Sequence, residues 1–174
     1  MSNFNESLDY VLKNEGLFSS RKSDKGGPTM MGITLKTYSE YLGRQATIEE
    51  LKALTKETVA PIYYHLYWAK LCLSMVNNNN IATAIFDIGV NCGVEEVAIL
   101  TQKSLVTLLA DVKIDGLMGF KTCEAIDKVD QGKFILTFEN EACQHYYKIV
   151  LHDSSDAPNL PGWLARAGRL LSLK

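Results

Sequence analysis

The sequence predicts a mainly α-helical fold that carries one small β-hairpin or loop element near residues 16–33. Apolar residues recur at helical spacing along most of the chain. Glycine and proline interrupt that spacing in one early polar stretch, at Gly16, Gly26, Gly27, Pro28 and Gly32. The chain has 174 residues, of which 47% are hydrophobic, so it can bury the core of one ordinary domain or two small ones.

A short amphipathic helix is predicted over residues 5–14. Apolar side chains lie on one face of this helix and one turn before it, at Phe4, Leu8, Val11 and Leu12. Glu15 then lies at the C-terminal end of the helix, directly before the glycine-rich stretch. A carboxyl group is therefore expected where a regular helix meets irregular backbone.

Start signals mark the helices that follow. Thr34 can cap a helix that ends near Tyr41, and residues 47–50 have the Thr-x-x-Glu form of a capping box. An aromatic-rich segment starts at Thr55, and Pro61 is expected to kink or delay its helix.

Longer helices are predicted in the second half. After the four asparagines of residues 77–80, a strongly apolar helix is expected to end at Gly89 or Gly93. Helical spacing continues over three further segments and a short terminal helix, with a turn at Asp115 to Gly119. The three segments are residues 95–110, 122–129 and 133–151.

Composition excludes several classes of protein. The formal charge of −2, without a block of like charge, argues against nucleic acid as a partner. No apolar run approaches the roughly 20 residues of a membrane-spanning helix, and no secretory signal is visible at the start. The four cysteines lie far apart and form no metal-binding spacing with histidine. Two disulfides are possible by count, but buried free thiols and no bound metal are expected.

Glu15, Asp24 and Thr29 are the candidate catalytic residues. Glycoside hydrolysis needs a carboxylic acid that protonates the leaving oxygen, and Glu15 has a suitable position. A second polar group must stabilise the transition state or activate a water molecule. Asp24 is the next suitable carboxylate, and the Thr29 hydroxyl can orient a water. Composition alone favours an ordinary solvated loop, because surface acids are common.

The order of these residues resembles the signature of the glycoside hydrolase family 108 lysozymes. Residues 14–18 are similar to the family's E-G-G-(Y/F) element, and residues 23–34 to its D-x-G-G-x-T-x-x-G-I-T element. Leu17 departs from the pattern, since a second glycine is usual there. The resemblance implies a lysozyme-like helical fold, cleavage of peptidoglycan with Glu15 as general acid, and no cofactor.

The resemblance continues beyond the glycine-rich stretch. Residues 63–68 look like the family's Tyr-x-x-x-Tyr-Trp element, and residues 86–93 like its F-D-x-x-V-N-x-G element. Tyr67 and Trp68 are therefore candidates to bind sugar rings, with burial in the core as the default interpretation. Asp87 and Asn91 lie one helical turn apart and are candidates for a cleft wall, or for buried structural groups.

The second half resembles the peptidoglycan-binding domain that commonly follows this catalytic domain. Its L-Q and D-G-x-x-G-x-x-T elements correspond to residues that include Gln102 and Asp115, although a structural Asx turn is the simpler role for Asp115. The G-W-x-x-R ending contains Trp163 and Arg166, which can contact the polymer or, more often, pack a terminal helix. We divide the chain into a catalytic domain, residues 1–92, and a binding domain, residues 93–174, that share an interface.

The sequence thus predicts an N-acetylmuramidase that cleaves the β-1,4 bond between N-acetylmuramic acid and N-acetylglucosamine. Phage-type lysis and local wall opening for protein export are both open as its role, and a holin-like membrane protein is the expected partner for export. We expect synthesis in the cytoplasm and action in the periplasm or cell wall. The alternatives are a non-catalytic wall-binding module and a lytic transglycosylase.

Overall fold

The computed structural model describes residues 3–15, 18–19 and 27–174. Within these ranges the chain forms nine α-helices and one two-stranded antiparallel sheet, which confirms the predicted mainly α fold. The elements up to Cys92 are α1 (Phe4–Asn14), β1 (Thr29–Met30), β2 (Ile33–Thr34), α2 (Leu35–Leu42), α3 (Ile48–Lys52), α4 (Lys56–Tyr63) and α5 (Asn79–Cys92). The later helices are α6 (Val94–Thr107), α7 (Phe120–Ile126), α8 (Gln131–His152) and α9 (Leu160–Arg169). Shorter helical turns are the π-helix η1 (Tyr64–Trp68) and the 3-10 helices η2 (Leu73–Met75), η3 (Ser154–Asn159) and η4 (Leu170–Leu173).

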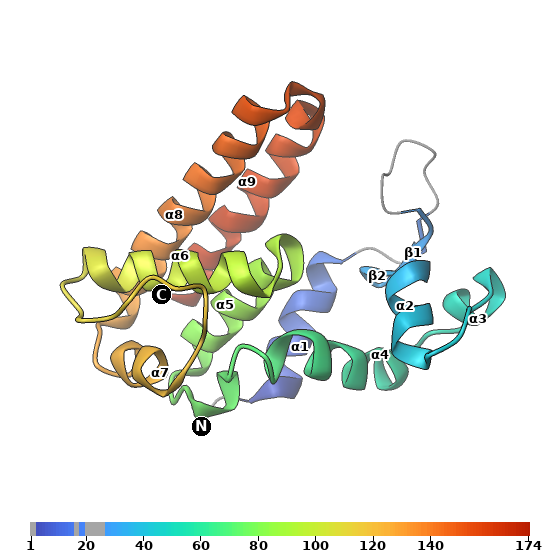
Figure 1. Ribbon diagram of the computed structural model, residues 1–174, viewed down its shortest axis with the longest axis horizontal. Coiled ribbons are helices and arrows are strands. Elements are labelled where there is room, and N and C mark those ends of the chain that lie inside the picture. The colour runs from blue at the N-terminus through green and yellow to red at the C-terminus, as the bar shows by residue number, and fades with distance from the viewer. Residues whose placement is uncertain (1–2, 16–17, 20–26) are drawn as a thin grey trace.

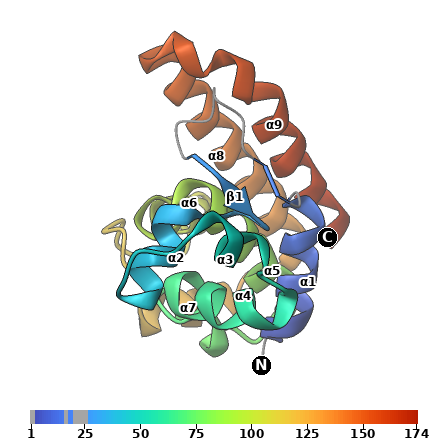
Figure 2. The same ribbon diagram turned by 90° about the vertical axis from the view of Figure 1, so that its right-hand side faces the viewer.

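Helix α5 is the centre of the molecule. It packs against α1, α6 and α8, while α8 and α9 run side by side as a long hairpin that projects from the body (Figures 1 and 2). Helices α2 and α3 lie at the end of the molecule away from α7 (Figure 1). The base of the α8–α9 hairpin therefore meets the same central helix that α1 packs on.

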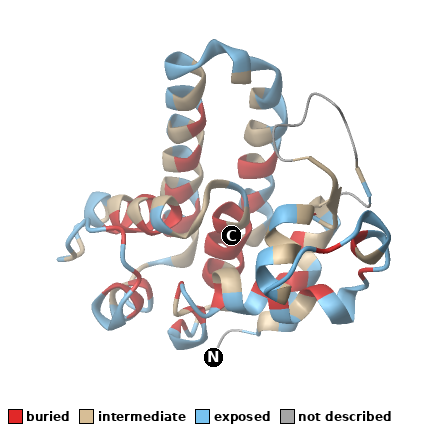
Figure 3. Ribbon diagram, turned by 45° about the vertical axis from the view of Figure 1, so that its right-hand side comes forward, coloured by how far each residue is buried: buried red, intermediate tan, exposed pale blue. Residues whose placement is uncertain are grey.

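One hydrophobic core extends through both halves of the chain. Every residue of α5 from Ile81 to Gly89 is buried, and the core continues from Leu8 in α1 to Leu170 after α9. Figure 3 shows the buried residues along the centre of the molecule and the exposed far end of the α8–α9 hairpin. The proposed division between residues 92 and 93 falls where Gly93 separates α5 from α6, and it stays a prediction.

Several local signals act as the sequence indicates. The Thr34 hydroxyl accepts the Thr37 amide at 3.0 Å at the start of α2. Thr47 and Glu50 form the capping box of α3, with Oγ1 accepting the Glu50 amide at 3.1 Å and the carboxylate accepting the Thr47 amide at 2.8 Å. Such caps satisfy the amides that the first turn of a helix leaves free.

Proline and glycine have different effects in two helices. Pro61 neither delays α4, which begins at Lys56, nor ends it; the change of helix type comes later, at the π-helix Tyr64–Trp68. Of the two glycines considered as the end of α5, Gly93 lies there with a φ of +90°, and Gly89 stays inside the helix. A Cβ at Gly89 would lie 3.0 Å from Val97 Cγ1, so Gly89 allows α6 to pack closely.

Two further expectations concern the membrane and the cysteines. In the described ranges, no helix is both long enough and apolar enough to cross a bilayer. All four cysteines are free thiols; Cys123 is buried, and Cys72, Cys92 and Cys143 are half-buried.

We predict that Phe86→Ala lowers the free energy of unfolding by about 3–5 kcal/mol, because Phe86 is fully buried between the rings of Tyr63 and Trp68. Phe120→Ala is the matched control, since Phe120 is 67% exposed, and its effect should stay within about 0.5 kcal/mol. Denaturant unfolding followed by circular dichroism measures both. Equal losses of unfolding free energy in the two variants would contradict the central role of α5.

Candidate active site

Glu15 ends helix α1. Its amide still donates to the Val11 carbonyl at 3.1 Å, but its φ of −84° and ψ of 132° are extended, so the helix stops there. The Glu15 side chain is 16% exposed. The end of a helix that packs on α5 thus carries a carboxyl group at the edge of the core.

The β-hairpin closes beside Glu15. Thr29 pairs with Thr34 and Met30 with Ile33, which leaves Met31 and Gly32 as a two-residue turn. Both turn residues have positive φ, +47° and +75°, as a type I′ turn requires. The buried Tyr63 hydroxyl donates to the Met31 carbonyl at 2.8 Å and thereby ties the turn to α4.

Gly32 lies against the Glu15 carboxyl group. A Cβ at Gly32 would lie only 2.6 Å from Glu15 Oε2 and 2.6 Å from the Tyr63 hydroxyl. No side chain fits there without a shift of these groups. The glycine is therefore required both by the left-handed backbone of the turn and by the close approach of Glu15.

Arg166 contacts Glu15 from the opposite end of the chain. Arg166 Nη1 lies 2.8 Å from Glu15 Oε1. The same guanidinium donates from Nε to Asp87 Oδ2 and from Nη2 to Asp87 Oδ1, each at 3.0 Å. One buried cation on α9 thus joins two carboxylates, one on α5 and one at the end of α1.

Charge and hydrogen bonding hold this group together. Asp87 is fully buried, and its Oδ1 also accepts the Asn14 side-chain amide at 3.1 Å. Burial lowers the pKa of Arg166, but Asp87 and Glu15 raise it by more, so the guanidinium stays charged. A buried charge is stable only when it is paired in this way. We call Glu15, Asp87 and Arg166, with Asn14, the carboxylate–arginine cluster.

Two tyrosines face Glu15 from α4 and from η1. Burial raises the pKa of Tyr63 and of Tyr67, and the nearby Glu15 raises both further, so the two hydroxyls are neutral at ordinary pH. Their rings lie 5.8 Å apart in a tilted arrangement. Tyr63 is fully buried, whereas Tyr67 is half-buried and forms part of the surface near the site.

The other residues predicted to bind sugar are placed differently. Trp68 is 1% exposed, and its indole N–H donates to Ser74 Oγ at 2.9 Å, so it packs in the core. Asp87 belongs to the buried cluster, while Asn91, one turn later on α5, is exposed. Burial in the core was the default interpretation for Trp68, and a structural role was the alternative for Asp87.

Thr29 and Asp24 were the predicted assistants of Glu15. Thr29 lies in β1, where its amide and carbonyl pair with Ser19 at 2.8 and 2.9 Å, and it is half-buried. Asp24 lies outside the described residues. Their catalytic roles stay predictions.

Gln102 and Asp115 hold a turn in the second half. Gln102 is buried and donates to Asp115 Oδ1 and to the Leu117 carbonyl, each at 2.9 Å. Asp115 accepts the Leu117 amide at 3.0 Å, which is the expected Asx turn, and Gly116 has a φ of +74°. The hydrogen bond from Gln102 is the main reason that the pKa of Asp115 is lowered. The polar groups of both residues are used within the turn, and their role in binding peptidoglycan stays a prediction.

Sequence patterns alone did not indicate the carboxylate–arginine cluster. Arg166 and Trp163 were expected either to contact the polymer or to pack the terminal helix. In the structure Trp163 stacks on Tyr146 at 5.4 Å, and Arg166 reaches past α5 to Glu15. The available signals were weak: an arginine on the apolar face of the terminal helix, and an asparagine directly before Glu15.

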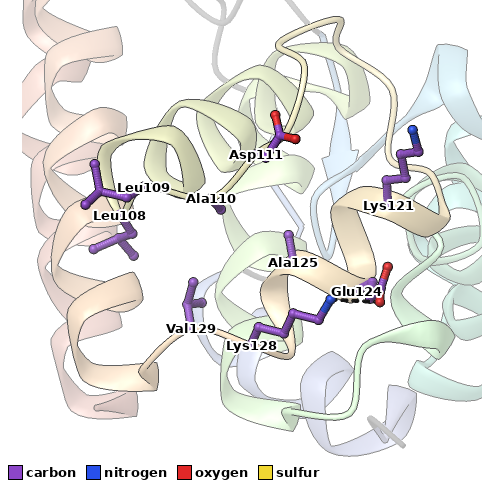
Figure 4. A pocket seen from close by; sticks show the side chains of 9 residues that line it. All are labelled: Leu108, Leu109, Ala110, Asp111, Lys121, Glu124, Ala125, Lys128 and Val129. Atoms are coloured by element: carbon purple, nitrogen blue, oxygen red, sulfur yellow. Dashed lines mark hydrogen bonds and ion pairs between the residues drawn. The ribbon is translucent and has the colours of Figure 1, made fainter.

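A separate pocket lies between the C-terminal end of α6 and helix α7 (Figure 4). Its volume is about 460 Å³. The Lys128–Glu124 ion pair, at 2.8 Å, lies on its wall. The pocket is lined by Leu108, Leu109, Ala110, Asp111, Lys121, Glu124, Ala125, Lys128 and Val129. None of the described site residues lines it.

No cluster of potential metal ligands occurs among the residues that the structure describes.

The profile of the family described as Glycosyl hydrolase 108 matches residues 8–93, just under half of the chain. This segment contains α1 from Leu8 onward, the hairpin and α5, and hence Glu15 and Asp87. The match supports the assignment of the chain to the glycoside hydrolases, as the resemblance of its motifs implies.

Among solved structures, the chain is similar to SagA of Brucella abortus. The two are 28% identical, with a TM-score of 0.80 over 97% of this chain and 91% of that one. The likeness therefore includes the second half, which the family match does not cover. A search of curated proteins found no match.

We predict that Gly32→Ala destabilises the protein by about 1–3 kcal/mol more than Gly43→Ala does. Both glycines have positive φ, so an alanine at either position strains the backbone by about 1–2 kcal/mol. Only Gly32 would push its new methyl group into Glu15 and Tyr63, because nothing lies within 4 Å of a Cβ at Gly43. Thermal and denaturant unfolding compare the two variants. Equal losses would show that the close approach to Glu15 is unimportant.

Proposed function

We propose that this protein is an N-acetylmuramidase that hydrolyses the β-1,4 bond between N-acetylmuramic acid and N-acetylglucosamine in peptidoglycan. The observation that carries the proposal is the placement of Glu15. It is a partly exposed carboxyl group at a helix end, enclosed by the hairpin turn and the buried cluster, inside the segment that matches Glycosyl hydrolase 108.

In the proposed reaction Glu15 is the general acid. Its carboxyl group donates a proton to the glycosidic oxygen as the bond to the anomeric carbon breaks, and the sugar develops oxocarbenium character. A water molecule attacks the anomeric carbon, loses a proton to Asp24 or to solvent, and leaves a reducing end. We assign the orientation of that water to Thr29 in β1 or to Asp24, and assign Tyr67 and Asn91 to the walls that contact the sugars.

The cluster explains why a substitution of Glu15 should leave the fold intact. Glu15→Gln removes the acid but leaves Arg166 with both of its hydrogen bonds to Asp87, so no buried cation loses its main partner. The amide has nearly the same shape as the carboxyl group. The substitution therefore tests chemistry rather than stability.

We predict that Glu15→Gln lowers the rate of peptidoglycan hydrolysis by at least about 10²-fold, because general acid catalysis contributes on this scale. Glu40→Gln is the matched control, an exposed glutamate that pairs with Lys36 on the surface of α2. Release of soluble fragments measures the rates, and circular dichroism confirms that both variants fold.

Mass spectrometry of the products separates the proposal from its alternatives. Reducing N-acetylmuramic acid ends support hydrolysis by a muramidase. Anhydro ends would instead identify a lytic transglycosylase, and no products from the wild type would identify a wall-binding module. A largely active Glu15→Gln variant would contradict the assignment of the acid.

We also propose that residues 93–174 contact the glycan or peptide of the wall beside the Asp115 turn. Leu117 and Phe120, 71% and 67% exposed, line a hollow of about 440 Å³ that also includes Asp115. Large apolar side chains exposed together mark binding surfaces more often than single ones do.

We predict that replacing Leu117 and Phe120 together by alanine weakens binding to insoluble peptidoglycan at least about 5-fold in the Glu15→Gln background. Loss of exposed apolar contacts of this size supports a decrease on the order of 1 kcal/mol or more. Leu151→Ala is the control, since Leu151 is 85% exposed on α8, away from this turn. Co-sedimentation measures the bound fraction, and unchanged binding would exclude this surface.

A further inference from the structure

This inference rests on the proposed function and concerns a residue outside the segment that matches Glycosyl hydrolase 108. We propose that Arg166, on α9, is the positioning residue of Glu15: it holds Oε1, so that Oε2 is the oxygen that reaches the glycosidic bond. The second half of the chain would then complete the active site as well as contact the wall.

The first support is the orientation of the guanidinium. An arginine side chain is long and flexible, but a paired set of hydrogen bonds to one carboxylate fixes its plane. Nε and Nη2 of Arg166 are both bound to Asp87, and Asp87 is fully buried and held by Asn14. The direction of the remaining nitrogen, Nη1, toward Glu15 is set by these contacts.

The second support is the anchoring of α9. Trp163 lies one turn before Arg166 and stacks on Tyr146 of α8 at 5.4 Å, with 23° between the rings. Ala167 is fully buried beside Arg166, and Leu170 is fully buried one turn later. These contacts place Arg166 at the base of the α8–α9 hairpin, where α5 and the end of α1 meet.

The third support is the enclosure of the Glu15 carboxyl group. Oε1 is buried, and Arg166 Nη1 is its charged contact at 2.8 Å, although no hydrogen bond of good geometry to Oε1 occurs within the described residues. Oε2 lies on the side of Gly32 and Tyr63, at the turn of the hairpin. With Oε1 held on the buried side, Oε2 is the oxygen available to a substrate.

A purely structural ion pair needs only Asp87 and Arg166. The third contact joins that pair to a residue that keeps 16% of its side chain exposed. The charged and titratable groups that face Glu15 in the described part of the chain are Arg166 on α9, Asp87 on α5, Tyr63 on α4 and Tyr67 on η1. The two tyrosines are neutral, so Arg166 and Asp87 determine the local field.

The test compares Arg166→Gln, Arg166→Lys and Asp87→Asn in the full chain. Arg169→Gln is the matched control, an exposed arginine one turn further along α9. Each variant is assayed for kcat and KM on soluble glycan fragments of peptidoglycan, and for the folded fraction by near-UV circular dichroism.

We expect Arg166→Gln to lower kcat by about 10- to 100-fold per folded molecule, with KM changed less than about 3-fold, because the acid is misplaced rather than removed. Asp87→Asn weakens the pair of hydrogen bonds that orients the guanidinium, so kcat falls there as well. Arg166→Lys keeps the charge without the planar fork, so kcat still falls.

A drop in folded fraction with kcat and KM unchanged per folded molecule would overturn the proposal and leave Arg166 a structural residue. If Arg166→Gln fails to fold, Arg166→Lys decides by the same two readouts. Should Glu15→Gln remain active, the proposed function fails instead. If Glu15→Gln is inactive while every Arg166 variant has wild-type kcat, only the positioning role is wrong.

Discussion

The ion pair of Arg166 with Asp87 and Glu15 is the interaction on which the arrangement of the site depends. It joins α9, α5 and the end of α1, three helices from distant parts of the chain, at one buried point. Two carboxylates share one cation there. Because the three groups are shielded from water, each ion pair is stronger than at the surface, and the loss of either partner leaves a buried charge unpaired. The packing of the α8–α9 hairpin on α5 is therefore coupled to the position of the Glu15 carboxyl group.

The hairpin encloses the same carboxyl group from the other side. Its type I′ turn brings the backbone of Gly32 against Glu15, and the Tyr63 hydroxyl holds the turn through the Met31 carbonyl. Under the proposed function Glu15 must lie at the protein surface and in a fixed direction, two requirements that oppose each other for a flexible glutamate. Placing the residue at a helix end, between a turn and a buried arginine, satisfies both.

The elements that depend on local sequence could be predicted, and the contacts between distant residues could not. Caps at Thr34 and Thr47, the end of α5 at one of two glycines and the Asx turn at Asp115 follow from short-range hydrogen bonding and positive φ, which a few neighbouring residues determine. The pairing of Arg166 with Glu15 depends on how α9 packs on α5, and the residues next to Arg166 in the sequence do not determine that packing. The delay expected from Pro61 was wrong, because α4 begins at Lys56, five residues before the proline.

The central claim is that Glu15 acts through Oε2 while Arg166 holds Oε1. The most direct measurement is a crystal structure of the Glu15→Gln variant with a bound glycan fragment of peptidoglycan that spans the scissile bond. The account predicts the glycosidic oxygen within about 2.6–3.2 Å of the side-chain atom that replaces Oε2, with the other atom still facing Arg166 Nη1. A glycan bound elsewhere, or a substituted side chain turned away from Arg166 toward the sugar, would contradict it.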